Sequence, residues 1–89
     1  MQIERSSQTV FTPLEGGTGV LLNLETLLYY SLNRTGSLVW RHIESAERVT
    51  IDELVRVTCK EFDIDEQGAR QALAPFVERL QELKMVRIL

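Results

Sequence analysis

The stretch from Leu21 to Trp40 constrains the fold of this chain more than any other part of the sequence. It contains two apolar runs separated only by Glu25-Thr26, and it leads directly into a helix start at Asn33 or Thr35. Two such runs joined by a short polar turn are typical of an antiparallel hairpin. Asn and Thr are both good N-cap residues. We therefore expect a hairpin that leads straight into a helix.

The second apolar run, from Leu27 to Leu32, predicts a strand with apolar or aromatic side chains on both faces. The strand period of two sorts its side chains into two sets, with Leu28, Tyr30 and Leu32 on one face and Leu27, Tyr29 and Ser31 on the other. We assign the Leu28 set to the core, because Leu32 lies immediately before the helix start and must turn inward with it. The opposite face then needs a cover of its own, which a partner can supply.

The rest of the chain extends this arrangement into an α+β fold. We expect strands near 8–12, 19–25 and 27–32, helices beginning near 33–35 and spanning 50–62 and 66–83, and an extended tail at 85–89. Thr50 and Glu53 form a capping box at the second helix. Asp63 or Asp65 can cap the last helix, which contains Pro75. The predicted order is a three-stranded antiparallel sheet followed by three helices, in one domain spanning residues 1–89.

Composition limits the function as well as the size. The 89 residues carry a net charge of -3, so the chain as a whole does not attract polyanions such as nucleic acid. No segment is apolar over the roughly 20 residues that span a bilayer, and no secretory signal is visible, so we expect a cytoplasmic protein. Cys59 and His42 stand alone, without metal-ligand or catalytic spacing around them. We therefore expect a binding protein without a cofactor, and not an enzyme.

A spaced motif then points to a family. Tyr30, Leu32, Asn33, Gly36 and Trp40 stand in the order Y-x-L-N-x-x-G-x-x-x-W. This run resembles that of PqqD-like proteins, the leader-binding domains called RiPP recognition elements. The resemblance continues through the helix start at Thr50, the segment 61–65 and the long last helix, so it covers nearly all of the chain. It implies a winged helix-turn-helix-like fold.

In PqqD-like domains, a leader peptide adds antiparallel to the third strand and lies in a groove against the third helix. The resemblance therefore implies that strand 27–32 and helix 66–83 bind a peptide here, a role that suits the unpaired backbone groups of an edge strand. The expected peptide-binding residues are Leu27, Leu28, Tyr29, Tyr30, Ser31, Leu32, Arg70, Leu73, Ala74, Phe76, Val77 and Leu80. Among them, we expect Arg70 to hold a carboxylate or carbonyl group of the leader.

Within this family, the free-standing chain most resembles the leader-binding proteins of lasso-peptide biosynthesis. This implies two partners, the precursor leader peptide and either a leader peptidase of the transglutaminase-like cysteine protease type or another modifying enzyme. The alternative within the family is the carrier of the pyrroloquinoline quinone precursor. The alternative from another class is a small winged-helix DNA-binding regulator, although acidic side chains crowd the last helix. We expect a monomer or weak dimer, with no nucleic acid or membrane as partner.

Overall fold

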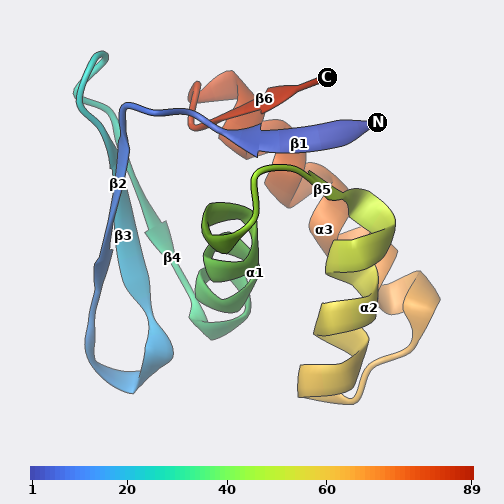
Figure 1. Ribbon diagram of the computed structural model, residues 1–89. Coiled ribbons are helices and arrows are strands. Elements are labelled where there is room, and N and C mark those ends of the chain that lie inside the picture. Colours follow the sequence, from blue (N-terminus) through green and yellow to red (C-terminus); the bar gives the residue numbers. More distant parts are fainter.

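The computed structural model describes all residues 1–89, which form an α+β fold (Figure 1). The strands are β1 (Gln2–Arg5), β2 (Thr9–Pro13), β3 (Gly19–Asn23), β4 (Tyr29–Leu32), β5 (Val49–Thr50) and β6 (Val86–Ile88). The helices are α1 (Arg34–Ser45), α2 (Ile51–Phe62) and α3 (Glu66–Glu82), and a 3-10 turn, η1 (Glu15–Gly17), lies between β2 and β3. The α+β class and the three helices confirm the sequence prediction. None of the helices combines the length and the apolar character needed to cross a membrane.

Two three-stranded antiparallel sheets stand where the sequence predicted one. The sheet β2-β3-β4 corresponds to the predicted strands. The second sheet, β5-β1-β6, joins both ends of the chain to the segment before α2 (Figure 1). In it, Ile3 pairs with Val49 on one side and with Ile88 on the other. The description as three strands followed by three helices was therefore incomplete, because pairing between such distant segments leaves no local sequence pattern.

β4 is shorter than the predicted strand 27–32. A turn occupies residues 24–26, and Leu27 has a positive φ of 63°, so the strand begins only at Tyr29. The side chain of Leu28 is 48% exposed, and its assignment to the core is wrong. The other two members of its set do turn inward, since Leu32 is buried and Tyr30 packs half-buried against the core.

The junction between β4 and α1 explains the spacing of the Y-x-L-N-x-x-G-x-x-x-W motif. Asn33 is the N-cap, and its Oδ1 accepts a hydrogen bond from the Gly36 N–H at 2.8 Å. Gly36 is buried, and a Cβ at this position would lie only 3.4 Å from the ring of Phe76 on α3. Trp40 follows one turn later and is fully buried. The helix cap, the contact with the Phe76 ring and the largest core side chain thus come from one short segment.

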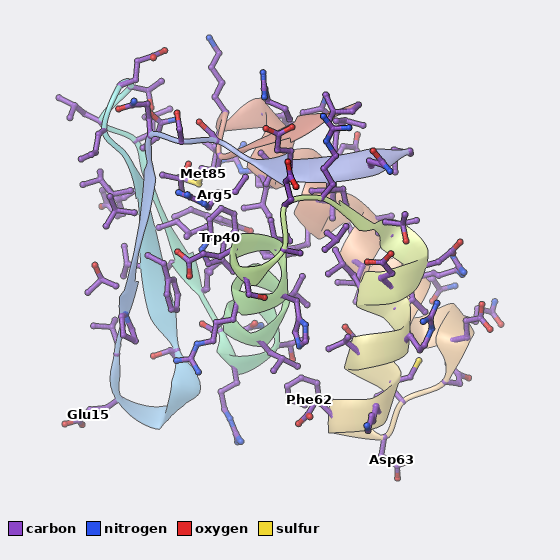
Figure 2. All side chains as sticks on the ribbon, in the orientation of Figure 1. Arg5, Glu15, Trp40, Phe62, Asp63 and Met85 are labelled. Carbon is purple, nitrogen blue, oxygen red and sulfur yellow. The ribbon has the colours of Figure 1, made fainter.

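A single core joins the helices to both sheets. Leu21 of β3 and Trp40 of α1 are fully buried, and Figure 2 shows Trp40 and Met85 in the space between the β2-β3-β4 sheet and the helices. The buried residues of α3 are Ala69, Leu73, Val77 and Leu80. The core therefore uses the main apolar stripe of α3.

Asn23 is a buried polar residue that joins the hairpin to the C-terminal part of the chain. It lies at the end of β3 and is 2% exposed. Its side-chain nitrogen donates a hydrogen bond to the Lys84 carbonyl oxygen at 2.9 Å. Its Oδ1 accepts hydrogen bonds from the N–H groups of Glu25 and Thr26, at 2.9 and 3.1 Å. One amide thus shapes the turn before β4 and ties that turn to the segment between α3 and β6.

Asn23→Ala should lower the free energy of unfolding by about 2 kcal/mol, because it removes three partly buried hydrogen bonds, each of which contributes about 0.5–1.5 kcal/mol. Urea unfolding followed by circular dichroism measures this loss. The control is Thr18→Ala, which removes one exposed hydrogen bond from Thr18 to the Glu15 carbonyl oxygen. The control should change stability by less than about 0.5 kcal/mol. Equal losses in the two variants would contradict the structural role of Asn23.

Candidate edge-strand binding site

β4 is an edge strand, because it pairs with β3 and with no other strand. Edge strands are commonly protected from further pairing by lysine, proline or a bulge. The residues of β4 are YYSL, so the strand has neither a charged residue nor a proline. Its open edge is therefore available for pairing with another extended chain.

The hydrogen bonds of the hairpin identify which backbone groups lie on that edge. The Asn23 N–H donates to the Leu28 carbonyl oxygen at 2.9 Å, so Asn23 and Leu28 stand at a hydrogen-bonded position of the ladder, although the Asn23 carbonyl oxygen accepts from the Leu27 N–H instead. Such positions alternate along an antiparallel ladder. Two residues further on, Tyr30 therefore also directs its backbone groups toward β3. The N–H and C=O groups of Tyr29 and Ser31 point to the open edge.

Two aromatic rings form a wall between β4 and α3. The ring centroids of Tyr30 and Phe76 are 6.3 Å apart, and their planes meet at 30°. The Phe76 ring also lies near α1, since a Cβ added at Gly36 would be in ordinary contact with it at 3.4 Å. A hollow of about 190 Å³ lies beside the ring pair, lined by Tyr30, Ser31, Leu32, Asn33 and Phe76. An apolar side chain of an added strand would meet the two rings here.

Three of the expected groove residues are part of the core instead. Leu73, Val77 and Leu80 are 2%, 5% and 0% exposed. A peptide on the surface cannot contact them without opening the core, so they position α3 from inside. Of the other predicted α3 positions, Phe76 is half-buried and Ala74 is exposed. The helical period correctly identified an apolar stripe, but it does not tell which part of that stripe stays accessible.

Arg70 lies on a different side of α3 from Phe76. Six residues separate them, which places them about 120° apart around the helix axis. The guanidinium of Arg70 donates to a carboxylate oxygen of Asp52 on α2 at 2.5 Å and to one of Glu66 at 3.0 Å. Both carboxylates raise the pKa of Arg70 through these hydrogen bonds. Arg70 therefore faces α2, and lines a cavity of about 660 Å³ there, contrary to the expectation that it faces β4.

Tyr29 also lies away from α3. Because successive residues of a strand alternate between faces, its side chain is on the face of the sheet opposite to that of Tyr30. Tyr29 and Leu27 are both 72% exposed. Tyr30, which the sequence analysis placed both on the core face and in the peptide-binding set, lies beside Phe76 of α3.

The chemistry of this site is main-chain pairing beside an aromatic contact. No group of three or more His, Cys, Asp or Glu residues is arranged to hold a metal ion. The predicted peptide-binding set includes both Tyr30 and Phe76, but sequence reasoning did not foresee that their rings pack against each other.

The chain is similar to known proteins in sequence and in fold. The family model described as coenzyme PQQ synthesis protein D (PqqD) matches residues 18–86. A structure of TbiB1 in complex with the TbiA(beta) leader peptide is similar at 25% identity, with a TM-score of 0.84 over 94% of each chain. A structure of lasso peptide synthetase B1 complexed with the leader peptide shares the fold, at 19% identity and a TM-score of 0.78, over 97% of this chain and 98% of that one. No curated protein sequence matches the chain.

Proposed function

This chain belongs to the PqqD family, and we propose that it binds the leader segment of a lasso-peptide precursor along the open edge of β4. The observation that carries the proposal is an unprotected edge strand with the Tyr30–Phe76 wall beside it. The chain also has the length and fold of TbiB1, which was solved with a leader peptide bound. Like other edge-strand receptors, it would take its ligand in an extended conformation.

Backbone pairing supplies the register of the bound leader. The N–H and C=O groups of Tyr29 and Ser31 pair with the leader, and each hydrogen bond contributes about 1 kcal/mol. The leader residue opposite Tyr30 directs its side chain to the face where Phe76 lies. Apolar contact with these rings selects among extended peptides that would otherwise pair equally well.

The domain would assist a separate enzyme by bringing the precursor peptide to it. It holds the leader, leaves the remainder of the precursor free, and raises the precursor's effective concentration near an enzyme that binds the domain. The partner enzyme we propose is a leader peptidase of the transglutaminase-like cysteine protease type. In this scheme the domain itself makes and breaks no bond, and it works in the cytoplasm where the precursor is made.

The description of the matching family supports a second candidate, the carrier of the precursor of coenzyme PQQ. Fluorescence polarisation with two labelled leaders separates the two functions. One leader comes from a lasso precursor encoded beside this chain, and the other from a pyrroloquinoline quinone precursor. Saturable binding of the first leader alone supports the lasso assignment, whereas tighter binding of the second would replace it.

Ser31→Pro should weaken binding of the lasso leader at least fivefold, since one lost backbone hydrogen bond of about 1 kcal/mol corresponds to roughly that factor. The Ser31 N–H points to the open edge, so proline leaves the pairing of β4 with β3 in place. Polarisation measures the affinity. Ser31→Ala, which keeps the N–H, is the control and should bind within twofold of the parent. A folded Ser31→Pro variant with unchanged affinity would exclude pairing at this edge.

Phe76→Ala should weaken leader binding about tenfold, because it removes half of the aromatic wall, and a lost apolar contact of about 1.4 kcal/mol corresponds to that factor. The matched control is Phe62→Ala at the end of α2, since Phe62 is also half-buried but does not line the hollow beside Tyr30 and Phe76. Thermal unfolding shows whether both variants remain folded. Equal affinity losses in the two variants would point to general destabilisation and contradict the specific role of Phe76.

Arg70→Gln should leave leader affinity within twofold of the parent, because the guanidinium is engaged with Asp52 and Glu66 on the α2 side. The same polarisation titration measures it. Arg79→Gln, which breaks another exposed ion pair on α3, is the control. A large and selective loss in Arg70→Gln would restore the role expected from the sequence, in which Arg70 holds a polar group of the leader.

A further inference from the structure

Two arginines of α1 line a hollow at one end of the molecule, which we call the arginine hollow. Arg41 follows Arg34 by two helical turns, so both side chains lie on nearly the same face of α1. The hollow has a volume of about 290 Å³ and is lined also by Gly17 of η1 and Glu61 of α2. Figure 1 shows the turn between β2 and β3, the start of α1 and the end of α2 together at the lower end of the molecule.

Both arginine side chains are positioned by uncharged neighbours. The Arg41 guanidinium lies over the ring of Phe11 on β2, 5.7 Å from the ring centroid. The stem of Arg34 runs past Gly17, where an added Cβ would lie 3.4 Å from the Arg34 Cγ. The ion pairs and side-chain hydrogen bonds of the protein involve other arginines. The N–H donors of Arg34 and Arg41 are therefore available to a ligand.

Ser37 lies between the two arginines on the same face of α1. It lines the arginine hollow and is 2% exposed, and its Oγ has no hydrogen-bond partner. Most buried hydroxyls are hydrogen-bonded, so this one calls for an explanation. An anion held between Arg34 and Arg41 would lie beside Ser37 and would give its hydroxyl an acceptor.

The charges that line the hollow suit a ligand with a single negative charge. Arg34 and Arg41 contribute two positive charges and Glu61 contributes one negative charge, so the net charge of the lining is +1. A carboxylate neutralises this charge. A phosphate group, with a charge of about −1.5 to −2 at pH 7, would exceed it and would be repelled by Glu61. Because arginine also binds carboxylates through paired N–H donors, the chemistry favours a carboxylate.

The path of a peptide bound to β4 leads to this hollow. Asn33 lines the hollow beside Tyr30 and Phe76, and the next residue, Arg34, lines the arginine hollow. The two hollows therefore meet at the start of α1. A peptide that pairs with β4 and extends beyond Leu32, the last residue of the strand, runs toward this point.

We propose that the arginine hollow binds the carboxylate of an acidic residue in the leader, in the segment that extends beyond Leu32 of β4. The inference rests on the proposed leader binding. It adds a charged contact to the apolar contact at Phe76, and it therefore specifies the class of peptide that the domain prefers. The preferred leaders carry an aspartate or glutamate outside the segment that pairs with β4.

The first test removes both positive charges from the hollow. The variant Arg34→Gln/Arg41→Gln should weaken binding of the labelled lasso leader about fivefold in the polarisation titration, as expected for partly exposed ion pairs. The matched control Arg56→Gln/Arg79→Gln removes two exposed arginines outside the hollow and should bind within twofold of the parent. Circular dichroism shows that the variants are folded. Unchanged affinity in the first variant, or equal losses in both, would overturn the site.

The second test locates the carboxylate in the leader. Each acidic residue of the leader outside the paired segment is exchanged for its amide. One exchange should weaken binding to the parent about fivefold and should have no further effect in Arg34→Gln/Arg41→Gln, because the two changes remove the same contact. A leader without such an acidic residue, or one in which no exchange behaves in this way, would overturn the proposal.

A third measurement examines the hollow without the leader. N-acetyl-glutamate amide, titrated into isotope-labelled protein, should shift the NMR signals of the Arg34 and Arg41 Nε–H groups, whereas N-acetyl-glutamine amide should not. Inorganic phosphate that shifts them at lower concentration would overturn the preference for a carboxylate. Shifts with the glutamate compound in a parent that does not bind the leader would refute the proposed function and the leader as ligand, but not the carboxylate site.

Discussion

The buried amide of Asn23 determines how the hairpin is attached to the rest of the molecule. Buried polar groups must find hydrogen-bond partners, and Asn23 finds one in the Lys84 carbonyl oxygen and two in the turn before β4. Thr9, its partner across the sheet, reinforces the attachment because its hydroxyl donates to the Met85 carbonyl oxygen at 3.3 Å. The turn that precedes β4 and the turn that follows α3 are thereby held together. β4 and α3 are the two elements that flank the proposed leader site.

The different faces of α3 have different roles: some residues stabilise the core, and others are placed to contact a ligand. Leu73 and Leu80 are buried in the core, whereas Arg70 is paired with carboxylates on the side facing α2. Phe76 lies at the margin between the buried stripe and the surface, where it is half-buried against Tyr30. A residue at such a margin is held in place by the core and still presents one side of its ring to a ligand. This explains why a helix rich in charge can flank an apolar site.

β4 has four different surfaces in four residues: two edges and two faces. One edge is used by β3, the opposite edge is open, and the two faces differ in their neighbours. The inner face meets Phe76 through Tyr30, and the outer face carries Tyr29 in line with residues of β2 and β3. Because strand side chains alternate, a peptide added to the open edge acquires the same two faces. Binding of one extended ligand therefore alters both sides of the sheet at once.

The sequence by itself determined the local elements and the family. Asn33, Thr50 and Asp65, each among the candidate caps in the sequence, begin the three helices, because capping is decided by residues only three apart. Only the tertiary structure decided the second sheet, whose strands pair across most of the chain. It also decided which apolar side chains are exposed, since the period of a helix or strand defines a face but not the neighbour that covers it. For that reason Leu28, which was expected in the core, lies at the surface. Val77, which was expected to contact a peptide, is buried in the core.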